Sequence, residues 1–228
     1  MRLVVSTSER GLNAADPVSD LAALRAKWDQ RHGSAEGLPA PALILREYGH
    51  LLPRPRRLPD CHPDWQQGEA LDLACGLGAN AIWLAQQGFQ VSAWDLSPVA
   101  IQRLSALARE RGLPVAALVR DVIAEPPPAE GFDLILVAHF LDRGLCRAIA
   151  DALRPGGLLF YQTFSREAVT ECGPSNPTYR LGPNELLDLF PDLIVRAYRD
   201  EGRVGDLRRG IRDLALLVAQ RLDRNPRR

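Results

Sequence analysis

Residues 70–81 read Ala-Leu-Asp-Leu-Ala-Cys-Gly-Leu-Gly-Ala-Asn-Ala, and residues 91–95 read Val-Ser-Ala-Trp-Asp. A short apolar run, a glycine turn, a helix-forming stretch and a second apolar run that ends in an acid follow one another here. This order is typical of the first half of an open α/β sheet that binds a nucleotide-like ligand. The stretch therefore predicts a parallel sheet with a ligand site at its first turn.

The residue types in this stretch suit such a site. Gly76 and Gly78 lack a Cβ atom, so the backbone can turn sharply and approach a ligand closely. Asp72 lies at the carboxyl end of the first expected strand and Asp95 at the end of the second, where open parallel sheets bind their ligands. A carboxylate at the second position can accept hydrogen bonds from both ribose hydroxyls, and it would repel a 2′-phosphate.

Three interpretations of the turn remain open at this point. Gly76-x-Gly78-x-x-Ala81 fits the dinucleotide fingerprint, but Asp72 would bring a negative charge close to a pyrophosphate. An ordinary turn without a ligand is the second interpretation. The third is S-adenosylmethionine, which offers a ribose to Asp95 and an ammonium group to Asp72. Here the chain resembles the class I S-adenosylmethionine-dependent methyltransferases, whose first motif reads acid-x-Gly-x-Gly-x-Gly, with Ala74 in place of the first glycine.

Patterning along the chain predicts a regular alternation of strands and helices. Helices are expected over residues 19–30, 38–52, 79–87, 98–111, 145–153 and 183–190. Further strands are expected over residues 115–119, 132–137, 158–164, 193–199 and 211–219, with a turn at Pro155-Gly156-Gly157. The predicted fold class is α/β: a Rossmann-like, seven-stranded, mostly parallel sheet with helices on both faces and a C-terminal antiparallel hairpin.

Later motifs extend the resemblance to the methyltransferases. Asp121-Val122 stands where that family usually contacts the adenine amino group, and residues 132–138 and 153–159 resemble its fourth-strand and fifth-strand motifs. The resemblance implies that S-adenosyl-L-methionine is the cofactor. The residues that it assigns to cofactor binding are Asp72, Ala74, Gly76, Gly78, Asn80, Asp95, Leu96, Asp121, Val122 and Ala138.

Bulk properties favour a cytoplasmic enzyme with one large domain. The 228 residues carry 28 basic and 28 acidic side chains, so no net charge attracts nucleic acid or an anionic membrane. Four cysteines without a C-x-x-C pair argue against zinc and against a disulfide framework, and no metal is expected. No apolar run is long enough to span a membrane. We expect residues 1–60 to form a flexible tail and a helical lid region, and residues 61–228 to form the methyltransferase domain, as a monomer or homodimer.

The methyl acceptor is constrained mainly by exclusion. After the fourth strand the chain reads Ala138-His139-Phe140-Leu141, without the Asn/Asp-Pro-Pro-aromatic motif of enzymes that methylate exocyclic base amines. Carboxylates for metal-dependent catechol methylation are absent from that strand end. The remaining resemblance is to the tellurite-resistance and thiopurine S-methyltransferase group, which shares a Trp-acid-x-Arg start, here at residues 28–31, and a Leu-x-Arg segment, here at residues 141–143. It implies a small, soft nucleophile such as a thiol or a chalcogen compound.

Candidate catalytic residues follow from position and chemistry. His139 could take a proton or polarise the acceptor, or could merely bond a loop carbonyl. Arg143 and Arg180 could pair with an anionic acceptor, or could be solvated surface residues. Tyr161 could line the pocket or pack beside the sheet.

Three functions remain open: a methyltransferase for a small soft nucleophile, a methyltransferase for RNA or protein, and a Rossmann oxidoreductase or a cofactor-binding module without turnover. A Tyr-x-x-x-Lys catalytic pair is impossible because Lys27 is the sole lysine. That argues against the oxidoreductase.

Overall fold

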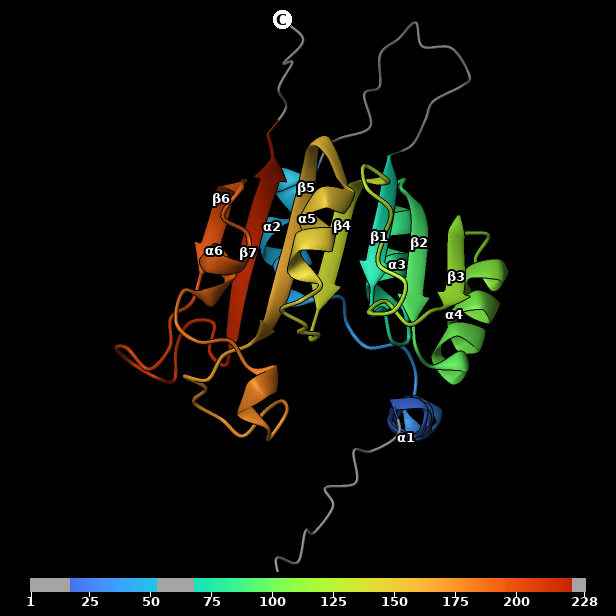
Figure 1. The fold of residues 1–228 in the computed structure, drawn as a ribbon, viewed down its shortest axis with the longest axis horizontal. Helices are drawn as coiled ribbons and strands as arrows, with labels where there is room; N and C mark the ends of the chain where they lie inside the picture. The colour runs from blue at the N-terminus through green and yellow to red at the C-terminus, as the bar shows by residue number, and fades with distance from the viewer. Residues whose placement is uncertain (1–16, 53–67, 223–228) are drawn as a thin grey trace, which may run out of the picture.

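The described part of the chain is built on a seven-stranded sheet with strand order β3-β2-β1-β4-β5-β7-β6 (Figure 1). The computed structural model describes residues 17–52 and 68–222. Strands β1 to β5 pair in parallel, and β7 pairs antiparallel with both β5 and β6. This confirms the predicted mostly parallel Rossmann-like sheet with a C-terminal antiparallel hairpin.

The strands lie close to the positions that the apolar runs predict. Their bounds are β1 (Glu69–Leu73), β2 (Gln90–Asp95), β3 (Val115–Val119), β4 (Phe132–Ala138), β5 (Leu153–Phe164), β6 (Leu193–Arg199) and β7 (Leu214–Arg221). The helices are α1 (Pro17–Ser34), α2 (Leu43–Tyr48), the 3-10 turn η1 (Gly49–Leu51), α3 (Ala79–Gln86), α4 (Pro98–Glu110), α5 (Cys146–Ala152), the 3-10 turn η2 (Pro177–Tyr179) and α6 (Glu185–Leu189).

Helices cover both faces of the sheet and divide the core in two. One apolar cluster joins the sheet to α2, α3 and α4, and the other joins it to α5 and α6. Central strand β4 contributes to both clusters, because residues 134–137 alternate between the two faces and are all fully buried. Burial on both faces explains why this strand reads as a continuous apolar run.

Two segments differ from the sequence-based expectation. Pro155-Gly156-Gly157 does not separate helix from strand, since β5 already begins at Leu153 and pairs with β4 through an irregular register. The helix expected over 38–52 is a short α2 followed by η1. Ile44 and Leu45 of α2 are buried in the core, next to the sheet.

The carboxyl ends of the parallel strands meet at one edge of the sheet, and α1 lies beyond the ends of β1 and β2 at that edge (Figure 1). None of the helices described has the length and hydrophobicity needed to cross a bilayer. The expected tail at residues 1–16 and the expected boundary at residue 60 lie outside the described residues.

Candidate functional site

The glycine turn between β1 and α3 depends on left-handed backbone at Gly76 (φ 53°) and Gly78 (φ 77°). A Cβ added at Gly78 would lie 2.3 Å from Cδ1 of Leu104, a fully buried side chain of α4. A Cβ at Gly76 would lie 3.3 Å from Cε1 of His32. The absence of a Cβ at Gly78 therefore lets α4 pack against the turn, and its absence at Gly76 leaves room beneath α1.

Ala74 also has a left-handed backbone, with φ 56°. The resembling family carries glycine here, and glycine adopts this conformation without the cost of about 1–2 kcal/mol that a Cβ imposes. The substitution thus keeps the shape of the turn and adds backbone strain at the end of β1.

Asp95 holds the turn from the end of the neighbouring strand. One carboxylate oxygen accepts a hydrogen bond from the Gly76 amide at 2.8 Å, and the other accepts one from the Ser97 amide at 2.8 Å. Asp95 is buried in the structure. Each carboxylate oxygen has a second acceptor position, so these contacts orient Asp95 and leave it able to accept from a diol.

Asp72 is almost completely buried at the end of β1. Its Oδ2 accepts from the Ala81 amide at 3.0 Å, whereas Oδ1 has no hydrogen-bond partner among the described residues. Burial raises the pKa of Asp72 to about 7, and the Ala81 amide and the Asn80 side chain act in the opposite direction. An orphaned carboxylate oxygen beside a glycine turn is suited to a ligand that carries a cationic donor.

The remaining predicted cofactor contacts lie around this edge with differing roles. Asp121 follows β3, and its Oδ1 accepts the amides of Ile123 and Ala124, so it caps a turn. Asn80 accepts the Ala42 amide at 2.8 Å and so fastens the chain before α2. Val122 is buried, and Leu96 and Ala138 are half-buried at the ends of β2 and β4.

His139 follows β4 in a left-handed conformation with φ 60°. Its ring stacks on Phe164, with ring centroids 5.1 Å apart, and its Nε2 lies 3.0 Å from Nε2 of Gln162. Although the residue is exposed overall, protein atoms crowd the imidazole. This partial burial lowers the pKa of His139, and the positive charge of Arg31 acts in the same direction.

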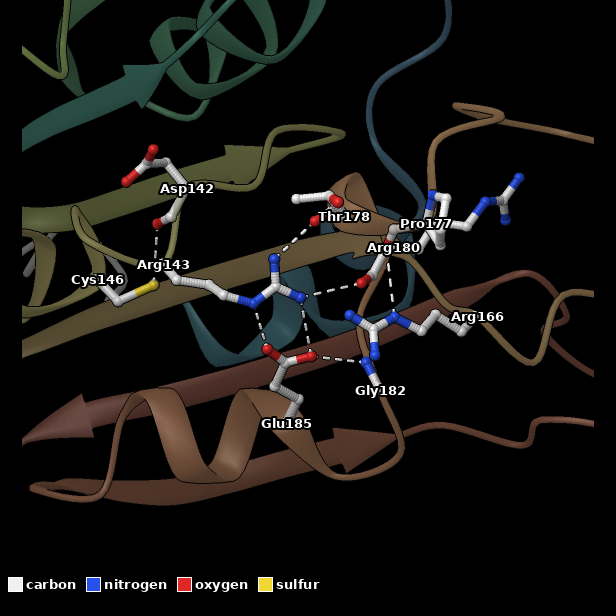
Figure 2. Close-up of polar contacts among 9 residues, drawn as sticks. All are labelled: Asp142, Arg143, Cys146, Arg166, Pro177, Thr178, Arg180, Gly182 and Glu185. Atoms are coloured by element: carbon white, nitrogen blue, oxygen red, sulfur yellow. Dashed lines mark hydrogen bonds and ion pairs between the residues drawn. The ribbon is translucent and has the colours of Figure 1, made fainter. Parts of the chain in front are cut away.

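Tyr161 and Arg143, two of the candidate catalytic residues, are engaged in contacts with other parts of the fold. Tyr161 is fully buried, and its hydroxyl donates to the Phe140 carbonyl at 3.0 Å. Arg143 makes a two-pronged ion pair with Glu185 and donates to the carbonyls of Thr178 and Arg180 (Figure 2). Tyr161 therefore fits the packing alternative that its sequence position left open, whereas Arg143 is held in an ion pair that neither of its two alternatives described.

Helix α1 covers the turn through contacts that the local sequence does not reveal. Oδ1 of Asp29 accepts from the Ser97 hydroxyl at 2.5 Å, and Arg103 donates to the carbonyls of His32 and Ala35. Burial lowers the pKa of His32, and the negative charge of Asp95 opposes this shift. The Trp-acid-x-Arg motif at residues 28–31 pointed to this segment as part of the family resemblance. It did not predict which residues of α4 the segment contacts.

No group of His, Cys, Asp and Glu within residues 17–52 and 68–222 is placed to hold a metal ion. This edge of the sheet carries acids at three adjacent strand ends, a left-handed glycine turn and a carboxylate oxygen without a hydrogen-bond partner in the described part of the chain. These features are those expected of a site for a cofactor that carries a ribose and an ammonium group.

The fold is that of the S-adenosylmethionine-dependent methyltransferases. Residues 70–157 match the family model described as a methyltransferase domain. The structure resembles TehB from Haemophilus influenzae with a TM-score of 0.56 and 18% identity, over 78% of this chain and 65% of that one. It also resembles an S-adenosylmethionine-dependent methyltransferase from Mesorhizobium loti, with a TM-score of 0.58 and 18% identity, over 79% and 98% of the two chains.

Curated relatives match over part of the chain. A ubiquinone biosynthesis O-methyltransferase from Idiomarina loihiensis is 31% identical over 113 residues, which are 46% of either protein. Its counterpart from Caulobacter vibrioides is 36% identical over 104 residues, or 42% of this chain and 40% of the relative. The chain thus spans less than half the length of these two relatives.

Proposed function

We propose that this protein is an S-adenosylmethionine-dependent methyltransferase that acts on a small, soft nucleophile of the thiol or chalcogen type. The observation that carries the cofactor assignment is the orphaned Oδ1 of Asp72, at the start of a glycine turn that Asp95 holds. The match of residues 70–157 to a methyltransferase domain supports the same assignment.

In this proposal the two acids, Asp95 and Asp72, bind different parts of the cofactor. Asp95 accepts hydrogen bonds from the ribose hydroxyls, and Asp72 accepts one from the ammonium group of the amino acid moiety. Asp121, at the end of β3, and the neighbouring Val122 amide are assigned to the adenine end. Gly76 and Gly78 shape the turn so that its backbone stays open to the ligand.

When bound, S-adenosylmethionine supplies a methyl group already activated by a sulfonium. The protein's own task is then to bind the acceptor in line and to exclude water. Helix α1 is placed to do the second, since His32 lies above Gly76 and Asp29 fastens the helix to Ser97. His139, at the end of β4, is assigned to the acceptor side.

Oxygen is the second candidate for the accepting atom. The curated relatives are named O-methyltransferases, and this is the observation that favours a hydroxyl acceptor. A hydroxyl acceptor would require a proton to be removed during transfer, whereas an ionised thiol would not.

The test is the formation of S-adenosylhomocysteine from S-adenosylmethionine with small thiols, selenite, tellurite, phenols, total RNA and a protein lysate in parallel. The proposal expects turnover with a thiol or chalcogen compound. Turnover with phenols alone would move the assignment to oxygen, and turnover with RNA or lysate alone would contradict a small acceptor.

A further inference from the structure

Gln162 of β5 joins the candidate acceptor side of the site to helix α2. The residue is 1% exposed, and its amide group lies between the Ile44 backbone and the imidazole of His139. Oε1 is 2.8 Å from the Ile44 nitrogen, and Nε2 is 3.0 Å from Nε2 of His139.

The Ile44 amide fixes which way the Gln162 side chain points. A backbone N–H can only donate, so the carbonyl oxygen of Gln162 must face it, and the NH2 group must then face His139. Rotating the amide by half a turn would set two donors against each other at Ile44. In a fully buried place that mismatch costs a hydrogen bond that water cannot replace.

The ring nitrogen that faces this NH2 group has to accept a hydrogen bond. A proton on Nε2 of His139 would point at the donor of Gln162, which excludes both the Nε2–H tautomer and the charged imidazolium in this arrangement. Stacking on Phe164 and the hydrogen bond from the His139 amide to the Gln162 carbonyl, 2.9 Å long, hold the two residues in register.

We propose that Gln162 is a positioning residue that holds His139 as a neutral imidazole with its proton on Nδ1. The lone pair of Nε2 is then occupied and Nδ1 carries a hydrogen, so His139 meets an acceptor as a hydrogen-bond donor and not as a base. The positive charge of Arg31 in α1 favours the same neutral state.

This inference rests on the proposed function in one respect, namely that the acceptor binds beside His139. A thiol or hydroxyl acceptor there must arrive already ionised, because His139 in this state cannot take its proton. Its lone pair forms the new bond to the methyl carbon, the bonding pair of the S–CH3 bond stays on sulfur, and no proton has to leave.

The test is the tautomer of His139 in the protein without cofactor, read from the nitrogen chemical shifts of the ¹⁵N-labelled imidazole. His139→Asn identifies its signals among those of the four histidines. At neutral pH we expect Nδ1 protonated and Nε2 unprotonated. A protonated Nε2 in the wild type, in either the neutral or the charged ring, would overturn the proposal.

Two variants test the role of Gln162 itself. In Gln162→Glu, a carboxylate faces His139, so the proton should move to Nε2 or the ring should become charged. Gln162→Met removes the donor at similar volume and should give a mixture of both tautomers. Wild-type signals in a folded Gln162→Met protein would contradict the assignment.

The matched control is Asn80→Ser, which removes the parallel side-chain contact to the Ala42 amide and loosens the same segment before α2. It should leave the tautomer of His139 unchanged, and a tautomer that shifts in this control would also refute a specific role for Gln162. Because these spectra require no cofactor, their outcome is independent of whether S-adenosylmethionine binds, which calorimetry decides separately.

Discussion

At the scale of single residues, strand ends were the predictable part of the site. Asp72, Asp95 and His139 each follow an apolar run, and all three lie at the carboxyl edge of the sheet. The face that a β5 side chain occupies could not be read in the same way. Tyr161 points to the α5 and α6 side, whereas Gln162 reaches α2 on the other side, and alternation alone does not say which face holds the ligand.

Burial of the Asp72 carboxylate predicts a stability that depends on pH. Its pKa is raised to about 7 in the folded chain, so the folded state binds more protons than the unfolded state between the two pKa values, and this group destabilises the fold as pH rises. Asp72→Asn should therefore raise the melting temperature of the cofactor-free protein more at pH 8 than at pH 5. Thermal melts at both values measure this, and an equal shift at both would contradict a buried ionising carboxyl.

The same residue makes a prediction for the ligand. A cationic ammonium group binds the ionised form of Asp72, so the affinity for S-adenosylmethionine should rise as pH increases toward about 7. It should fall again at higher pH, where the ligand's own ammonium group loses its proton. Asp72→Asn should weaken binding and flatten this dependence. Calorimetric titration over that range is the measurement, and a wild-type affinity that does not vary with pH would exclude the contact.

At the scale of elements, the glycine turn shows how packing sets a residue choice. Gly78 and Gly205 have nearly the same backbone angle, φ 77° and 75°, but a Cβ at Gly78 meets Leu104 whereas one at Gly205 meets nothing within 4 Å. Gly78→Ala should therefore cost about 2–4 kcal/mol of unfolding free energy, and Gly205→Ala about 1 kcal/mol. Denaturant unfolding measures both, and equal losses would mean that backbone strain alone decides.

The ion pair of Arg143 and Glu185 ties the segment after β4 to the start of α6 (Figure 2). The hydrogen bond from Arg143 lowers the pKa of Glu185. Arg143→Ala leaves two carbonyls and a carboxylate without their donor, so we expect a loss of about 2 kcal/mol in stability. Cofactor affinity should remain unchanged.

Arg147→Ala is the matched control for this element. Arg147 pairs with two acids, Asp151 and Asp192, but its side chain is 73% exposed. The melting temperature of this variant should stay at the wild-type value, because solvent screens such pairs. A loss of methyl transfer in Arg143→Ala with stability and cofactor affinity intact would instead support a catalytic role for Arg143.

For the whole molecule, the order of strands and helices followed from the sequence because each apolar run has a clear period and clear ends. The contacts between distant segments did not. The Gln162 side chain binds an amide 118 residues away, and Asp29 binds Ser97 across 68 residues. No local pattern encodes such pairs, so the contacts by which α1 covers the turn and by which α2 is anchored emerge only from the folded chain.

The central claim is that the edge formed by Asp72, the glycine turn and Asp95 binds S-adenosylmethionine. Calorimetric titration of the cofactor into the full chain tests it most directly, with Asp95→Ala as the site variant and Asp192→Ala, an exposed acid in an ion pair with Arg147, as the control. We expect one cofactor per chain for the wild type and the control, and no measurable binding for Asp95→Ala. Equal affinity in all three proteins, or no binding by the wild type, would contradict the account.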